Sequence, residues 1–308
     1  MSSREWRCNQ PDRKKLRKNR WDSRIDRRKR LSHIGASGLA FGWGRRFRLP
    51  TGFTAPKGAV LLPALALVLL TPALAQDARQ IVDESQKRGR ANSQHYEGVL
   101  EVTPSNGKVT TKSWQSFRLG SYGNSKAIIR FTAPADVKGV ALLVVNHPDR
   151  SSDQWMWTPA IGRDRRIALQ DRSTRFFGTD FSFEDLEERD VDQYDFRLTG
   201  EEPIDGAACW RIESRPRQGK TSQYTLSRVW IRKDNYVPAQ YENFIKDQLV
   251  RRLHQTGIRN VQGIWTPCVL EMTDLRRNSH TVLRLEKLEY NVPMKDDDFT
   301  VQALRRDQ

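Results

Sequence analysis

The 308-residue chain is poor in the residues from which metal centres and disulfide frameworks are built. It has 3 cysteines and 5 histidines, with no C-x-x-C pair and no His-Glu-x-x-His sequence. Each histidine stands alone, so the spacing needed for a zinc site is missing. A G-x-S-x-G nucleophile elbow and a complete G-x-x-x-x-G-K-[ST] phosphate loop are also absent. We therefore predict no metal, no cofactor and no enzymatic activity.

A long apolar run is lacking as well. The uncharged run from Ala59 to Leu70 has 12 residues, whereas a membrane-spanning helix needs about 20. Lys57 precedes this run, and Ala73-Leu74-Ala75 follows it as an A-x-A cleavage sequence. We interpret residues 58–75 as the apolar region and cleavage site of a secretory signal peptide, cut between Ala75 and Gln76. The mature protein is then expected to be periplasmic.

The net charge of +16 belongs to one part of the chain. Residues 1–57 hold 17 Lys and Arg against 4 Asp and Glu, which leaves 36 against 33 for residues 76–308. A nucleic-acid surface needs a surplus of basic residues, so the nearly neutral part predicts no nucleic-acid partner. We interpret residues 1–57 as a basic extension, either disordered or assigned from a start site too far upstream. A nucleic-acid-binding arm is the alternative.

Residues 76–308 show the pattern of one β-rich domain. Apolar and polar residues alternate in short segments bounded by turn residues, which indicates strands. Two segments are helix candidates, 77–90 and 181–190, and Ser182 with Asp185 could form a capping box in the second. About a dozen strands with so few helices favour an antiparallel sheet that curls into a barrel or half-barrel. The clearest strands are expected at 95–102, 109–119, 125–132, 140–147, 194–200, 207–214, 222–232, 237–246, 248–255, 264–272 and 281–290.

Two groups of residues leave alternatives open. Cys209 and Cys268 each lie in an apolar predicted strand. In an exported protein they could form a disulfide, or each could be a buried free thiol. The acidic run at 181–190 could supply a general-acid pair, but such a dense run is more typical of a solvated helix face.

Aromatic residues are concentrated on the predicted strands. Either they form a packed core, or they line a cavity for an apolar ligand on the inner face of a half-barrel. Tyr224, Leu226 and Trp230 are expected to fall on the same face of one strand. Our aromatic candidates for the cavity are Trp114, Phe117, Phe131, Trp155, Trp157, Tyr224, Trp230, Tyr241 and Trp265.

Several longer segments resemble one family. The most specific is FFGTDFSFED at 176–185, which resembles F-x-G-[ST]-D-[FL]-S-x-[ED]-D. Together they make the chain similar to the LolA-like outer-membrane lipoprotein-sorting proteins over residues 77–304, with Met294 at a position where the family has Ile or Leu. The other matching segments are 130–139 (F-x-x-P-x-D-x-x-G), 155–160, 206–213, 230–238 and 291–304.

The resemblance implies an unclosed antiparallel β-barrel with a few helices as a lid over an apolar concave face. It also implies a periplasmic carrier of lipid or lipoprotein acyl chains toward the outer membrane, with Arg118 on an early strand taking part in ligand handling. An inner-membrane transporter and an outer-membrane acceptor are the implied partners of a monomeric protein. The alternative is a periplasmic sensor or regulator of the same fold that binds a membrane protein.

Overall fold

The structure is a computed structural model that describes residues 6–7 and 77–306. The predicted cleavage site at Ala73, Ala75 and Gln76 lies outside these residues, as does nearly all of the predicted basic extension. No helix in the described part of the chain is long and apolar enough to cross a membrane.

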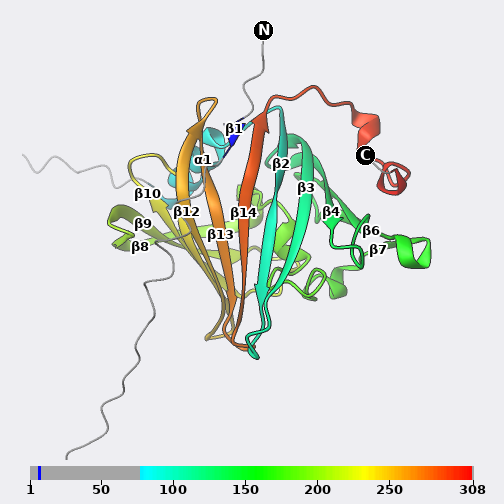
Figure 1. Ribbon diagram of the computed structural model, residues 1–308. Coiled ribbons are helices and arrows are strands. Elements are labelled where there is room, and N and C mark those ends of the chain that lie inside the picture. Colours follow the sequence, from blue (N-terminus) through cyan, green and yellow to red (C-terminus); the bar gives the residue numbers. More distant parts are fainter. Residues whose placement is uncertain (1–5, 8–76, 307–308) are drawn as a thin grey trace, which may run out of the picture. The chain divides into compact units, whose positions relative to one another are not determined.

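One α-helix, α1 (Ala78–Arg88), and a large antiparallel sheet make up residues 77–306 (Figure 1). The 3-10 turns are η1 (Pro159–Ile161), η2 (Leu169–Asp171), η3 (Glu184–Leu186), η4 (Val191–Gln193), η5 (Asp296–Asp298) and η6 (Ala303–Arg305). The strands are β1 (Trp6–Arg7), β2 (Ser93–Thr103), β3 (Thr110–Ser121), β4 (Asn124–Ala133), β5 (Ala141–Asn146), β6 (Asp153–Thr158), β7 (Arg163–Arg166), β8 (Tyr194–Ile204), β9 (Ala207–Pro216), β10 (Leu226–Arg232), β11 (Pro238–Ile245), β12 (Gln248–Val261), β13 (Ile264–Asp274) and β14 (Ser279–Tyr290).

The strand order is β7-β6-β5-β4-β3-β2-β14-β13-β12-β11-β10-β9-β8, and β1 pairs with β14 beside this path. Two meanders, β2 to β7 and β8 to β14, meet where β2 pairs with β14 (Figure 1). The edges β7 and β8 do not pair, so the sheet of 13 strands is not closed into a barrel. The predicted mainly-β half-barrel is confirmed.

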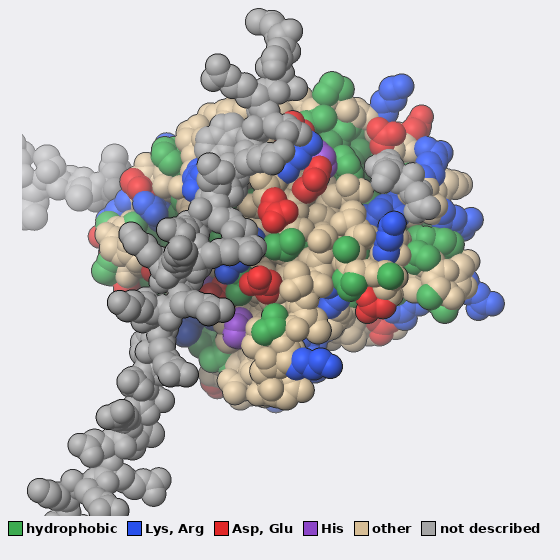
Figure 2. Space-filling view, viewed as in Figure 1, with side chains coloured by type: hydrophobic (Ala, Val, Ile, Leu, Met, Phe, Trp, Pro, Cys, Tyr) green, Lys and Arg blue, Asp and Glu red, His purple; other side chains and the backbone are tan. Residues whose placement is uncertain are grey.

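Residues on the two faces of the sheet are identified by cross-strand pairing, because directly opposed side chains point to the same side. Phe117 pairs with Ile128, Ile128 with Leu143, and Leu143 with Trp155. The C-terminal residues Phe299, Ala303 and Leu304 pack against this set, which defines the convex face. Acidic and basic side chains are interspersed on the surface seen in Figure 2, in keeping with the near-balanced charge of residues 76–308.

The concave face carries the alternate residues of the same strands. Ser116 pairs with Ile129, Ile129 with Leu142, and Leu142 with Met156. The connection between β7 and β8 runs over this face and inserts Phe176, Phe181 and Phe183 against Phe131 and Leu142. Phe131 and Phe176 stack with ring centres 5.3 Å apart. This connection therefore fills part of the concave face.

The acidic run at 181–190 differs from the predicted solvated helix. It contains a single 3-10 turn, η3, and the side chains of Asp185, Glu187 and Glu188 are only 4%, 6% and 6% exposed. The helical interpretation was wrong because each of these carboxylates pairs with an arginine outside the run and is buried by it. The expected capping box is present: the Ser182 amide donates to Asp185 over 2.7 Å, and the Asp185 amide donates to Ser182 Oγ over 3.3 Å.

Candidate ligand cavity

Helix α1 lies on the concave face and covers it. Asp77 caps the helix by accepting a hydrogen bond from the Arg79 amide at 3.3 Å, and Lys87 and Arg88 lie in the last turn, where they complement the helix dipole. Ala78, Ile81 and Val82 form its buried stripe, packed against inward residues of β9 and β10. The helix is therefore held by apolar contact with one half of the sheet.

Two hydrogen bonds tie α1 to the connection that precedes β8. Arg79 donates to the carbonyl of Val191 at 3.2 Å, and Gln86 Nε2 donates to the carbonyl of Arg189 at 2.6 Å. The Arg79 guanidinium also pairs with the carboxylate of Asp192. Helix and connection together cover the concave face, so that the predicted lid consists of one helix and an irregular segment.

Two adjoining cavities of about 370 and 340 Å³ lie beneath this cover. They share part of their lining, including Arg118, Tyr241, Leu270 and Leu283. Each volume falls in the range of small-molecule sites, about 300–1,000 Å³. The apolar wall of the larger cavity consists of Val82, Ile129, Phe181, Leu186, Phe196, Val229, Ile231, Pro238, Leu253, Leu270, Met272 and Leu283.

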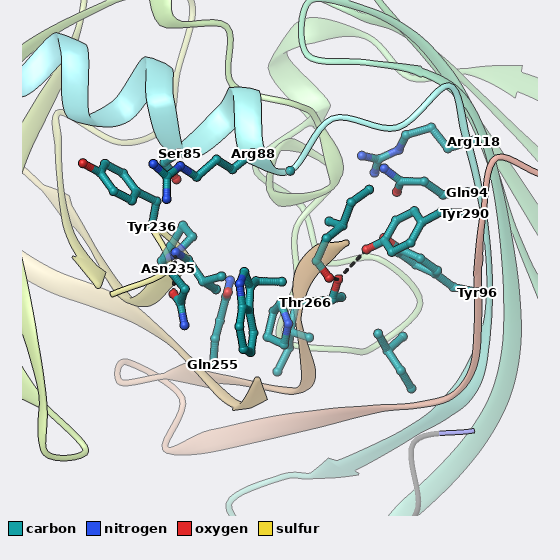
Figure 3. Close-up of a pocket in the computed structure, with 18 of the residues that line it drawn as sticks. Ser85, Arg88, Gln94, Tyr96, Arg118, Asn235, Tyr236, Gln255, Thr266 and Tyr290 are labelled. Atoms are coloured by element: carbon teal, nitrogen blue, oxygen red, sulfur yellow. Dashed lines mark hydrogen bonds between the residues drawn. The ribbon is translucent and has the colours of Figure 1, made fainter. Parts of the chain in front are cut away.

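The smaller cavity is bordered by hydroxyl, amide and guanidinium groups as well as by apolar side chains (Figure 3). Tyr96 and Tyr290 meet with hydroxyl oxygens 3.2 Å apart, and the Tyr290 hydroxyl lies 2.5 Å from Thr266 Oγ1. Ser85 and Arg88 of α1 reach the cavity from the opposite side (Figure 3). Burial raises the pKa of Tyr96 well above its usual value, and the pKa of Tyr290 is raised for the same reason. These hydroxyls are therefore neutral hydrogen-bonding groups at physiological pH.

Arg118 lies at the junction of the two cavities. Its Nη1 donates to Glu188 Oε1 at 2.5 Å, and Ser125 Oγ donates to the other oxygen of that carboxylate at 2.6 Å. Asn146 donates to Ser125 Oγ at 3.0 Å and accepts from the Glu188 amide at 3.3 Å. The charge of Arg118 is thus already compensated by a well-bonded carboxylate.

Arg189 is bonded differently. Its guanidinium carbon lies 6.0 Å from the ring centres of Tyr194 and Tyr224 and 5.8 Å from that of Tyr241, and its Nη2 donates to Asn243 Oδ1 at 3.3 Å. Burial alone would lower the pKa of Arg189, but the surrounding tyrosines and acids raise it. The side chain lines the larger cavity as a cation.

Four of the ten predicted site residues line the cavities, and the other six lie elsewhere in the fold. Trp114 and Trp265 line the smaller cavity, whereas Arg118 and Tyr241 line both. The other candidates occupy three environments: Phe131 is in the concave core, Phe117, Trp155 and Trp157 are in the convex cluster, and Tyr224 and Trp230 lie in the second meander.

Tyr224 and Trp230 do not share a face as the alternation predicted. Strand β10 begins at Leu226, so Tyr224 precedes it and turns inward, where its hydroxyl donates to Asp185 at 2.8 Å. Trp230 packs with Cys209 and Ala239, and its indole N–H donates to Glu202 at 3.0 Å. Cys209 is a buried free thiol, so it does not pair with Cys268.

Several lining residues were not singled out from the sequence. Tyr96 lies on a predicted strand, and its alternation with Gly98 and Leu100 was a usable signal for an inward face. Tyr290, Leu270 and Leu283 also lie on predicted strands. Arg189 had no such signal, because it lies within the acidic run at 181–190. Among the described residues, no group of three or more His, Cys, Asp and Glu side chains is placed to hold a metal ion.

The unclosed half-barrel with a covered apolar cavity places the chain in the LolA-like class of folds. A domain described provisionally as an outer membrane lipoprotein-sorting protein, from Vibrio parahaemolyticus, is 25% identical with a TM-score of 0.71, covering 74% of this chain and 98% of its own. A DUF1329 family protein from Desulfovibrio piger is 30% identical with a TM-score of 0.71, covering 74% and 97%. A LolA superfamily protein from Nitrosomonas europaea, 20% identical, shares the fold with a TM-score of 0.60 over 74% and 100%.

A family model described as "uncharacterized protein"-like matches residues 123–306. The comparison with curated proteins found no match. The chain belongs to the DUF1329 family, and it is similar to the LolA-like outer-membrane lipoprotein-sorting proteins, with which it shares the fold.

Proposed function

We propose that this protein is a carrier that binds lipid or lipoprotein acyl chains in its concave cavity and moves them toward the outer membrane. The observation that carries the proposal is the pair of adjoining cavities beneath α1, with apolar side chains from both meanders lining the larger one. An acyl chain gains about 0.8 kcal/mol for each methylene group that it buries. The cover is held by a few contacts, so that movement of α1 provides a route for loading and release.

The relatives support the same proposal. The domain from Vibrio parahaemolyticus is described as lipoprotein-sorting, and we place this protein in the periplasm after removal of the segment that ends at Ala75. An inner-membrane transporter would supply the ligand to a monomeric carrier, and an outer-membrane acceptor would receive it. We propose a binding protein rather than an enzyme, because the carboxylates of Glu188 and Asp185 at the cavity are engaged by Arg118 and Arg251.

The first experiment is native mass spectrometry of the protein purified from its own periplasm, followed by titration with the fluorescent fatty acid cis-parinaric acid. Leu283 lines both cavities, and Leu283→Trp should displace about two methylene groups of ligand, weakening binding about tenfold. Val282 is its neighbour on the same strand and does not line either cavity, so Val282→Trp is the matched control. A protein without bound lipid that also fails to bind the probe would overturn the proposal.

A further inference from the structure

Each acid that lines the larger cavity has at least one basic partner. Asp185 pairs with Arg251 at 2.8 Å, and Glu188 pairs with Arg118 at 2.5 Å. Glu187 pairs with Arg172 at 2.5 Å and has Lys220 at 3.9 Å. Within a few residues of chain, three carboxylates are therefore neutralised by cations outside the run, Arg118 and Arg251 on strands and Arg172 earlier in the same connection.

Arg189 follows these acids and makes no direct ion pair with any carboxylate of the described residues, and Glu184 and Asp185 stabilise its charge only from a longer distance. No carboxylate of the described residues lies within 4.0 Å of its guanidinium, which has five N–H donors and one hydrogen-bond acceptor from the protein, Asn243 Oδ1. The three tyrosine rings stabilise the cation through their faces but accept no hydrogen bond from it. A cation held in an apolar cavity with most of its donors unused is suited to an incoming anion.

The surroundings of Arg189 determine what else such a ligand must contain. Phe196, Val229 and Leu253 line the same cavity, so the remainder of the ligand contacts apolar side chains. Arg118 is less suited to bind the anion, because its charge is already compensated by the carboxylate of Glu188.

We infer that the cavity selects an amphiphile with an anionic oxygen head, a carboxylate or a phosphate, that pairs with Arg189 while its acyl chain lies along the apolar wall. The inference rests on the proposed carrier function and specifies its ligand: a fatty acid or an anionic phospholipid, in preference to a neutral acyl ester. A planar guanidinium binds either head through two parallel hydrogen bonds. Gln86 of α1 lines the same cavity as Arg189, so a head bound there lies beneath the cover.

The test compares ligands that differ only in the head. The intact purified protein is titrated with cis-parinaric acid and with its methyl ester, and in competition with phosphatidic acid and with diacylglycerol of the same acyl chains. We expect the acid and phosphatidic acid to bind about ten to a hundred times more tightly than their neutral counterparts. Binding of one acid alone would identify a carboxylate or a phosphate as the preferred head.

Three variants connect the preference to Arg189. Arg189→Gln should weaken the acids to the level of the esters and leave the esters unchanged, whereas Arg189→Lys should retain part of the preference as a point charge. Arg252→Gln, on the exposed part of β12, is the matched control, and far-UV circular dichroism checks that each variant folds. An acid preference that survives in Arg189→Gln would overturn the assignment.

The two proposals fail in different ways. Equal binding of acid and ester by the unchanged protein would refute the anionic head and leave the carrier in place. Absence of binding for every amphiphile, with no lipid copurifying, would refute the carrier itself. The comparison on the unchanged protein decides the question even if Arg189→Gln does not fold.

Discussion

Arg251 on β12 donates to the carboxylate of Asp185 over 2.8 Å, with side-chain exposures of 2% and 4%. The Tyr224 hydroxyl completes a triangle: it donates to Asp185 at 2.8 Å and accepts from Arg251 at 2.8 Å. This buried triangle fastens the connection between β7 and β8 to the concave face. It therefore fixes the neighbouring residues, Glu188 and Arg189, at the cavity.

Breaking this pair should be costly. Arg251→Met leaves Asp185 as an uncompensated buried charge, and we expect the free energy of unfolding to fall by about 3–5 kcal/mol. Arg252 is the matched control, because it lies next in the chain but pairs with Glu242 at 2.7 Å with 44% of its side chain exposed. Arg252→Met should cost less than about 1 kcal/mol. Urea unfolding of both variants measures the difference, and equal losses would contradict a structural role for the triangle.

Asp153 should make stability depend on acidity. Burial raises the pKa of this carboxyl, but hydrogen bonds from Arg150, Arg166 and His147 lower it more, so the net pKa is well below its usual value. The unfolded chain, with a pKa of about 3.9, then binds a proton at a higher pH than the folded protein does. The stabilisation is present above about pH 4 and is lost as the pH falls through the lower folded pKa.

The variant Asp153→Asn tests this. It should be less stable than the unchanged protein by about 1–3 kcal/mol at pH 7, and this deficit should shrink at pH 3 and below. Thermal unfolding across this range gives the curve, with Asp149→Asn, at an exposed neighbouring position, as control. A deficit that is independent of pH would show that the carboxylate's charge is not what stabilises the site.

Gly98 is required where the two meanders meet. A Cβ atom at this position would lie 2.1 Å from the carbonyl oxygen of Arg284 on β14, beside the register shift between Leu285 and Lys287. Gly98→Ala must separate β2 from β14, and we expect a loss of about 3 kcal/mol. Gly107 has a φ of +76° with open space around it, so Gly107→Ala should cost only about 1 kcal/mol. Similar losses in the two variants would argue against a close approach at Gly98.

The sequence predicted the strands well because period-two alternation is a local property. It could not tell which face of β3 to β6 is concave, since the chain covers both: Phe176 lies against one face and Phe299 against the other. Nor could the sequence distinguish Arg189 from the arginines on the surface. Arg189 lacks an ion pair because the neighbouring acids pair with distant residues, Asp185 with Arg251 and Glu188 with Arg118. These pairs join residues 66 and 70 positions apart.

A substitution at Trp157 distinguishes an effect on packing from an effect on ligand binding. It lies in the convex cluster with Ala303 and Leu304, and the Arg305 guanidinium carbon is 5.7 Å from its ring centre. Trp157→Ala should therefore loosen the C-terminal segment and lower the free energy of unfolding by about 1–3 kcal/mol. Binding of cis-parinaric acid should be unchanged, because no wall of either cavity beneath α1 contains Trp157.

Leu283→Trp provides the opposite pattern, a loss of affinity with little loss of stability. Titration and urea unfolding of both variants measure the two quantities side by side. A loss of affinity in Trp157→Ala at unchanged stability would mean that the ligand contacts the convex face. The carrier would then hold its acyl chain between the sheet and the C-terminal segment rather than beneath α1.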